Sequence, residues 1–525
     1  MHRRTVRSFA FATTMMLGFA VAGCDSDSAT PASSTTPATD APVATDPPPT
    51  DPPATDPPAT DPPDTVAPAA IGEIDWEDQG DGLQDGFLEV PLDYDDPTAG
   101  TLNLYLVRHS AADPAARIGS LLVNPGGPGF GGSGLAWSAE FIYGQDLVDR
   151  FDIIGWDPRG TGSSEPFVDC VDDYDRYFGV DSSPDDAAER DALIELATEF
   201  GEGCVERMGD VLPHLSTENS ARDMDAIRQA VGEETISYFG FSYGSELGAT
   251  WATMFPATVR AAVLDGAVDP TVPYLDQNIQ QAAGFEATFA TFLAECSADP
   301  SCAFHNGGDA EGAFDALAAA MDAAPAATED GRPAVTHGVL ITAVSQAMYG
   351  DSMWPALEQA LADLQEGDGD GILSLYDEYY GYYGGGSWAD DLEAYFAIGC
   401  LDDPGSTGPD DLYSHEAEFA AAAPRLGRSW MLELTICSVW PIEPVAPLAI
   451  TGAGAGPIVV VGTTGDAATP LESTRNMAEA LEDGHLVIVE ANQHTAYGLT
   501  SCADDLIDAY LVDPTTPLED ETFCS

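Results

Sequence analysis

Short apolar runs that each end in a polar or glycine-rich turn constrain the fold of this chain more than any other feature. Such runs occupy residues 118–124, 151–156, 235–241 and 259–265, and helical patterns cover 217–231 and 242–255. Apolar strands that alternate with helices are typical of a parallel sheet covered on both faces. The sequence therefore predicts an α/β fold with a mostly parallel central sheet, whose ligand site lies at the carboxyl ends of the strands.

The same alternation places the domain boundaries. Residues 86–92 and 101–109 read as paired strands that open the core, and strand and helix patterns resume after residue 457. Between them, residues 270–441 are mainly helical and rich in alanine. We expect one core built from residues 71–269 and 442–525, with 270–441 inserted as a helical cap.

The first 24 residues predict an export signal. Arg3, Arg4 and Arg7 precede an apolar stretch over 9–22, which is too short to span a membrane comfortably. The stretch ends in VAGC, which resembles a bacterial lipobox and predicts that Cys24 carries the lipid. The alternative is an ordinary cleaved signal peptide with a chance cysteine. We expect an exported protein held to the outer face of the membrane by its lipid, or secreted if this anchor is not used.

Residues 25–70 predict a disordered linker. They consist mainly of Thr, Pro, Asp, Ala and Ser, and the five-residue units DPPPT, DPPAT, DPPAT and DPPDT follow one another. This composition cannot bury a core. Because proline pairs favour an extended chain of about 3.1 Å per residue, the linker can hold the enzyme domain well away from the membrane.

The charge excludes one class of function. The chain carries 89 acidic residues and 17 basic ones, all of them arginine, for a formal charge of -72. Binding to a nucleic-acid backbone needs a basic face, so nucleic acid is not an expected partner. The acidity fits either a strongly solvated surface or the attraction of cationic substrates, and the sequence leaves both interpretations open.

The nine cysteines fit an oxidising compartment. Setting Cys24 aside leaves eight, an even number that can form four disulfides. Short spacing predicts the pair Cys296–Cys302. Order along the chain predicts the other three pairs, which are Cys170–Cys204, Cys400–Cys437 and Cys502–Cys524.

The motif GFSYG at 240–244 predicts a nucleophile at Ser242. It stands between a predicted strand and a predicted helix, where a serine on a sharp turn needs small neighbours. The N–H of Tyr243 is one expected oxyanion donor. The second is expected from the loop NPGGPG at 124–129, at Gly127 in the first place and Gly126 in the second. A glycine-rich turn that serves only backbone geometry is the alternative for this loop.

The acid and the base should follow the serine in that order. Asp466 follows the strand predicted over 457–462, and His494 follows the strand predicted over 485–490. Asp265, at the end of an earlier strand, is the rival acid, and a helix cap is the alternative role for Asp466. His485 begins its strand and is expected to be exposed. The sequence therefore predicts a catalytic triad of Ser242, Asp466 and His494.

Five motifs in order resemble one known family. NPGGPG (124–129), WDPRGTGSS (156–164), GFSYGS (240–245), VLDGAVDP (263–270) and GDAATP (465–470) are together similar to the secreted tripeptidyl aminopeptidases of actinobacteria. These are relatives of prolyl aminopeptidases, whose loop reads HGGPG. The resemblance implies an α/β-hydrolase fold, the same triad and the oxyanion donor at Gly127. Asn492 and Gln493 depart from it, because relatives often have glycine before the histidine.

The expected activity is a serine exopeptidase that releases short peptides, of the tripeptidyl type, from free N-termini. An esterase or lipase-like hydrolase on the same triad is one alternative, and a non-enzymatic surface lipoprotein on a hydrolase scaffold is another. No cofactor or metal is implied. A substrate amine needs a carboxylate partner, for which Asp402 and Asp403 are the candidates. The sequence leaves the oligomeric state open.

Overall fold

The computed structural model describes residues 71–96, 98–328, 332–389 and 391–525. The predicted signal peptide, the linker and Cys24 lie outside the described residues, so these stay predictions. Residues 68–525 form one of two units of the chain, and the description below concerns that unit alone. Within its described part, no helix has both the length and the apolar character that a membrane crossing requires.

A ten-stranded sheet forms the centre of the fold, in the order β1-β2-β3-β5-β4-β6-β7-β10-β11-β12. Pairing is antiparallel from β1 to β5 and parallel from β5 to β12. This confirms the mostly parallel sheet. The strands are β1 (Glu77–Gly80), β2 (Leu83–Pro91), β3 (Thr101–His109), β4 (Gly119–Asn124), β5 (Phe151–Asp157), β6 (Ile236–Phe241), β7 (Val259–Asp265), β10 (Ile458–Thr463), β11 (Gly484–Val489) and β12 (Glu521–Cys524).

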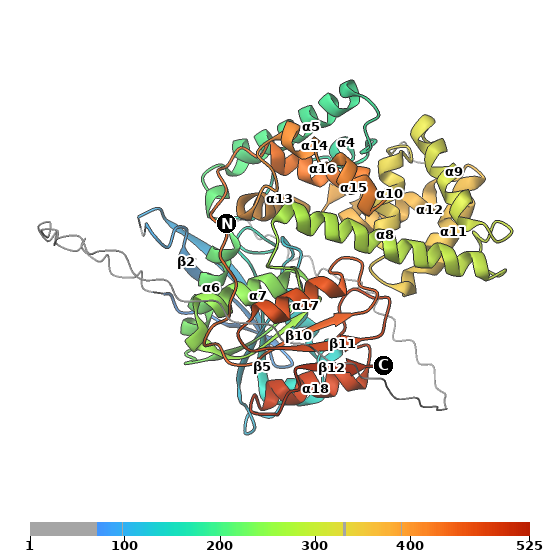
Figure 1. Cartoon of the computed structure of the whole chain (residues 1–525). Coiled ribbons are helices and arrows are strands. Elements are labelled where there is room, and N and C mark those ends of the chain that lie inside the picture. The colour runs from blue at the N-terminus through green and yellow to red at the C-terminus, as the bar shows by residue number, and fades with distance from the viewer. Residues whose placement is uncertain (1–70, 97, 329–331, 390) are drawn as a thin grey trace, which may run out of the picture. The chain divides into compact units, whose positions relative to one another are not determined.

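Helices cover both faces of this sheet, as the apolar strands require. Every residue of β4, β5 and β10 is buried, whereas β2 alternates between buried and exposed positions near the sheet edge. One face packs against α6, α7 and α17, and the other against α2, α3 and α18. Figure 1 shows α7 and α17 on one side of the strands and α18 on the other. These helices are α2 (Ala139–Ile142), α3 (Gln145–Arg150), α6 (Thr217–Ala230), α7 (Tyr243–Met254), α17 (Leu471–Ala480) and α18 (Ser501–Val512).

Between β7 and β10 the described residues are mainly helical, apart from one short hairpin. In Figure 1 its helices gather beyond the α7 face of the sheet. They are α8 (Tyr274–Ala298), α9 (Ala310–Ala323), α10 (His337–Ala347), α11 (Trp354–Gln365), α12 (Asp370–Tyr380), α13 (Asp391–Asp402), α14 (Pro409–Tyr413), α15 (Glu416–Ala422) and α16 (Gly427–Ser438), with the hairpin β8 (Tyr382–Gly384) and β9 (Ser387–Trp388). We call this segment the cap.

Two helices from within the first core segment pack with the cap. They are α4 (Asp175–Phe178) and α5 (Ala187–Met208), which precede α6 in the chain. Phe178 stacks on Phe396 of α13 with ring centroids 5.9 Å apart, and Phe200 meets the same ring edge-on at 5.5 Å. The sequence analysis did not foresee this contribution, because an amphipathic helix does not reveal which layer will cover its apolar face.

All four predicted disulfides are present: Cys170–Cys204, Cys296–Cys302, Cys400–Cys437 and Cys502–Cys524. Cys400–Cys437 joins α13 to α16 within the cap. Cys502–Cys524 joins α18 to β12, the last strand of the sheet, which pairs in parallel with β11. The chain terminus is therefore fixed beside the strand that leads into the His494 loop.

Candidate active site

Ser242 occupies a sharp turn between β6 and α7. Its backbone has φ 55° and ψ −126°, a conformation that residues other than glycine rarely adopt. The Ser242 N–H donates to the Asp265 carbonyl at 2.8 Å, which holds the turn against β7. A Cβ on Gly240 would lie 2.3 Å from the Gly244 carbonyl oxygen, so the flanking glycines are required sterically.

His494 and Asp466 meet on the loops that follow β11 and β10. The His494 Nδ1 lies 2.9 Å and 3.0 Å from the two carboxylate oxygens of Asp466. That carboxylate also accepts the N–H groups of Ala468 and Thr469, at 3.0 Å and 2.8 Å. Asp466 is 4% exposed, so its charge is held in place by several donors rather than by water.

The environment of His494 favours its use as a base through Nε2. Burial opposes protonation of the ring, but the charge of Asp466 and the hydrogen bond to it outweigh burial and raise the pKa of His494. Because Nδ1 faces the carboxylate, it carries the proton in the neutral ring. Nε2 is buried and has no hydrogen-bond partner among the described residues. The geometry therefore leaves one basic nitrogen available for proton transfer.

The loop after β4 approaches the serine turn closely. Gly126 has φ +103°, and a Cβ there would lie 2.7 Å from Ser242 Cβ and 2.6 Å from the Phe241 carbonyl oxygen. The Gly126 N–H already donates to the Asn124 side chain at 2.9 Å. The neighbouring Gly127, with φ +110°, has no such bond among the described residues, which favours its N–H as an oxyanion donor.

Comparisons with known proteins agree with this geometry. Residues 119–306 match a family model described as alpha/beta hydrolase fold, and residues 423–524 match one described as TAP-like protein. The serine protease Hip1 of Mycobacterium tuberculosis is 34% identical over 450 residues, which cover 82% of this chain and 85% of that protein. The chain belongs to this α/β-hydrolase family. It is an enzyme of the serine-hydrolase type, and the alternative of a non-enzymatic lipoprotein is set aside.

Two further relatives of this hydrolase carry different names. The tripeptidyl aminopeptidase of Streptomyces lividans is 31% identical over 482 residues, with 87% of each chain covered. The carboxylesterase B of Mycobacterium tuberculosis is 33% identical over 446 residues, which cover 82% of this chain and 84% of that protein. Family membership is therefore shown, whereas the substrate class differs among relatives of similar identity.

Asp265, the rival acid, has a different position in this hydrolase. It is fully buried, and its carboxylate accepts the N–H groups of Ala496 and Tyr497 at 2.8 Å each. Burial raises its pKa to about 7, although these N–H groups and His494 act in the opposite direction. No hydrogen bond joins Asp265 to the His494 ring among the described residues. Its contacts hold the backbone that follows His494 rather than the imidazole itself.

The cap contacts both the backbone and the ring of His494. The His494 N–H donates to the Tyr349 carbonyl at 2.8 Å, and the two rings meet edge-on at 5.5 Å. Gly350 forms an isolated antiparallel bridge with Gln493. A Cβ on Gly350 would lie 2.4 Å from the Gln493 side-chain oxygen, so a larger residue at 350 would displace the end of that side chain. The departure at Gln493 thus has a structural partner in the cap, which no sequence motif indicated.

Asp402 and Asp403 lie at the end of α13, and both accept protein hydrogen bonds. Asp402 accepts the N–H and the hydroxyl of Thr217 at 2.9 Å and 2.6 Å. The Thr217 hydroxyl is also 2.5 Å from the Tyr243 hydroxyl. Asp403 accepts the N–H groups of Gly405 at 2.8 Å and of Tyr274 at 3.3 Å. Burial raises the pKa of Asp402 to about 7.

Glu246 is an acidic residue of the site that sequence reasoning missed. It lies one helical turn after Ser242 on α7. Burial raises its pKa to about 8, and the nearby Asp402 and Asp403 act in the same direction. Its spacing of four residues from Ser242, the N-cap of α7, was the available signal, since a residue at this spacing lies about one helical turn further along.

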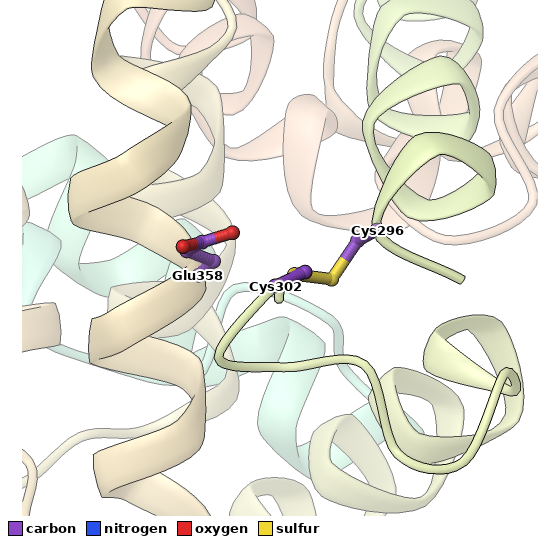
Figure 2. Close-up of side chains that lie close together, drawn as sticks. All are labelled: Cys296, Cys302 and Glu358. Carbon is purple, nitrogen blue, oxygen red and sulfur yellow. A yellow bond between two sulfur atoms is a disulfide. The ribbon is translucent and has the colours of Figure 1, made fainter. Parts of the chain in front are cut away.

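One group of side chains has the spacing of a metal site but not its chemistry. Among the described residues, Cys296, Cys302 and Glu358 bring possible ligand atoms within 4.8 Å of one another. The two sulfurs are joined in a disulfide, and Glu358 stands beside it on α11 (Figure 2). A cysteine binds a metal as its thiolate, so these two cysteines cannot bind a metal while the disulfide is intact.

Proposed function

We propose that this hydrolase is an exported aminopeptidase that releases short peptides, of the tripeptidyl type, from free N-termini through Ser242, His494 and Asp466. The observation that carries the proposal is the His494–Asp466 pair, held on adjacent strand-end loops of the sheet that also carries the Ser242 turn. The named relatives include a tripeptidyl aminopeptidase of matching length.

The mechanism follows from the positions of these groups. His494 takes the proton of Ser242 through Nε2 as the serine oxygen attacks the substrate carbonyl, and Asp466 stabilises the charged imidazole. The N–H groups of Gly127 and Tyr243 stabilise the oxyanion, and each such donor lowers the barrier by about 3 kcal/mol. His494 then protonates the leaving amine, and water releases the acyl group.

The charge distribution near the serine supports a cationic substrate group. Glu246, Asp402 and Asp403 lie close together, and none of them forms an ion pair among the described residues. A protonated peptide N-terminus beside these carboxyl groups would favour their ionised forms, so the cluster can compensate such a cation. The assignment of the amine contact to Asp402 and Asp403 stays a prediction. Both carboxylates already accept backbone N–H groups, which leaves them fewer lone pairs for a substrate amine.

An esterase acting on short acyl esters is the second candidate, because one relative is named carboxylesterase B. The test compares three substrates: trialanyl p-nitroanilide, its N-acetyl form and p-nitrophenyl butyrate. An aminopeptidase cleaves the free-amine anilide far faster than the acetylated one. Comparable rates on both anilides, or activity on the ester alone, would contradict the aminopeptidase proposal and favour the esterase.

Anchoring through Cys24 is part of the proposal and rests on the sequence alone. Cys24→Ala should release the protein from the membrane fraction or block its maturation, because a diacyl anchor needs the cysteine thiol. Cell fractionation with an antibody to the enzyme domain measures this. A variant that stays in the membrane fraction as before would show that the anchor is elsewhere.

A further inference from the structure

A short segment of the cap pairs with the loop that carries His494. The segment is residues 349–351, which follow α10, and we call it the clamp. The His494 N–H donates to the Tyr349 carbonyl at 2.8 Å. The Asp351 N–H donates to the Asn492 carbonyl at 3.1 Å, and the isolated bridge described above lies between these two bonds. The clamp and the histidine loop therefore form a short antiparallel pairing between the cap and the core.

The core contacts the same loop through the end of β10 and the residues that follow it. The Thr463 hydroxyl donates to the Gln493 carbonyl at 2.6 Å. The Gly465 N–H donates to the Ala491 carbonyl at 2.8 Å. Asp466 is the next residue of this segment, so the same backbone carries the acid of the triad. The histidine loop thus has backbone partners in two places, the segment of the catalytic acid and the clamp.

The backbone directly after His494 has an unfavourable conformation. Thr495 has φ +66°, which is uncommon for a β-branched residue. Its N–H donates to Asp466 at 3.2 Å, and the next two N–H groups donate to Asp265. A strained backbone persists only where the surrounding contacts hold it. The clamp supplies the contact on the N-terminal side of Thr495, so its loss would allow the loop to relax and to move the imidazole.

The Tyr349 ring adds a side-chain contact to this pairing. Its centroid lies 5.5 Å from that of the His494 ring, in an edge-on arrangement. On the cap side, the buried Phe285 of α8 meets the Tyr349 ring edge-on at 5.5 Å and lies 4.7 Å from Trp430 of α16. Edge-on aromatic pairs of this kind are favourable. The imidazole therefore lies between the Asp466 carboxylate and a ring that is packed into the cap.

We propose that the clamp positions the catalytic base: it keeps His494 in the orientation that proton transfer from Ser242 requires, and Tyr349 is its positioning residue. This inference rests on the triad of the function proposed above, and it holds for either substrate class. The cap is then part of the catalytic machinery. A clamp that is released leaves substrate binding largely unchanged and lowers the rate of the chemical step.

Two variants disrupt the clamp, and each has a matched partner. Asp351→Pro removes the N–H that donates to Asn492. Proline is tolerated at the first position of the short helix Asp351–Met353, and Gly350 before it has φ −171° and ψ 145°, which accommodates a following proline. Asp351→Ala removes the same exposed side chain and keeps the N–H. Tyr349→Leu removes the aromatic ring, whereas Tyr349→Phe keeps it.

We expect Asp351→Pro and Tyr349→Leu each to lower kcat by about 10- to 100-fold, because a small misplacement of a catalytic group has an effect of this size. The decrease should appear on both trialanyl p-nitroanilide and p-nitrophenyl butyrate, with KM changed by less than about twofold. The rate at which diisopropyl fluorophosphate modifies Ser242 should fall in parallel, since this reaction needs the base but no peptide recognition. Asp351→Ala and Tyr349→Phe should stay within about threefold of the wild type on all three measures.

Proton NMR supplies a readout that a loss of stability alone does not change. The Nδ1 proton that His494 shares with Asp466 gives a resonance at low field, which is assigned by its absence from His494→Gln. This resonance should be unchanged in Asp351→Ala and should shift or disappear in folded Asp351→Pro. A thermal melt shows which variants are folded, and Tyr349→Leu decides the question should Asp351→Pro fail to fold.

The outcomes separate this inference from the proposed function. If His494→Gln keeps its activity, the triad is wrong and the proposed function fails with it. If the triad stands while the folded clamp variants keep both kcat and the low-field resonance of the wild type, the proposed function stands and the assignment of the clamp is wrong.

Discussion

The sheet side and the cap side of the site are built in different ways. Ser242, Asp466 and His494 each follow a parallel strand within a few residues, so the backbone of the sheet brings them to one edge. The cap contact with His494 comes instead from Tyr349, in the turn after α10 and far from the strands along the chain. The difference teaches that the positions of these three residues depend on local backbone geometry, whereas the contacts that the cap makes with them depend on helix packing.

The largest expected effect tests the sheet side. Ser242→Ala should lower kcat by about 10⁴-fold or more while the protein stays folded, because loss of the nucleophile removes the covalent route. Steady-state kinetics on the best substrate, with a thermal melt beside it, measures both. Retention of most of the activity would refute the triad, since no second serine of the described chain has this turn.

The next effect compares two carboxylates on the same edge of the sheet. Asp466→Asn should lower kcat by about 10³- to 10⁴-fold, because the neutral side chain no longer fixes the tautomer or stabilises the charged ring. It should also lower the pKa of the acid limb of the pH–rate profile, since Asp466 raises the pKa of His494. Asp265→Asn keeps the shape of the loop anchor and should cost less. The reverse order would move the acid to Asp265.

Elements set by local pattern could be read from the sequence. The predicted strands over 151–156 and 259–265 are β5 and β7, and the helix predicted over 217–231 is α6, capped by Ser216. These runs combine strong periodicity or full burial with clear turn residues. The motifs at the strand ends also predicted that His494 and Asp466 lie close together, because adjacent parallel strands end at the same edge. In the structure the His494 Nδ1 lies 2.9 Å from the Asp466 carboxylate.

Contacts that depend on the packing of distant segments could not be read in this way. Three features have no local signature in the sequence. They are the bridge between Gly350 and Gln493, the position of β12 at the sheet edge, and the packing of α5 against the cap. Glu246 was missed for another reason, because its spacing from Ser242 indicates its place on the helix but not its burial. In a chain with 89 acidic residues, nothing in the sequence distinguishes a buried carboxylate from a solvated one.

A smaller loss of activity is expected where Asp402 of the cap contacts the residues beside Tyr243. Asp402 accepts the hydroxyl of Thr217, which lies 2.5 Å from the hydroxyl of Tyr243, the proposed donor of an oxyanion N–H. If this contact positions Tyr243, Asp402→Asn should lower kcat by about 10-fold on both the free-amine anilide and the ester. This decrease is smaller than the one expected when an oxyanion donor is removed altogether. Asp410→Asn, at an exposed site of the cap, is the control. A loss confined to the anilide, with KM raised, would instead make Asp402 the amine contact.

The smallest expected effect concerns stability and pH. Burial raises the folded-state pKa of Glu246 to about 8, whereas an unfolded glutamate titrates near about 4.3. The folded state therefore binds this proton more tightly, so the stabilisation from Glu246 is full below about pH 4 and is lost as the pH rises to about 8. Glu246→Gln stays neutral throughout, and its Tm should exceed that of the wild type by about 2–4 °C at pH 8.5 but not at pH 5.

Glu234→Gln removes the same charge from an exposed carboxyl and serves as the control. A Tm difference that does not change between the two pH values would show that Glu246 is ionised in the folded enzyme at pH 5, and that the acidic cluster beside the serine carries its full charge.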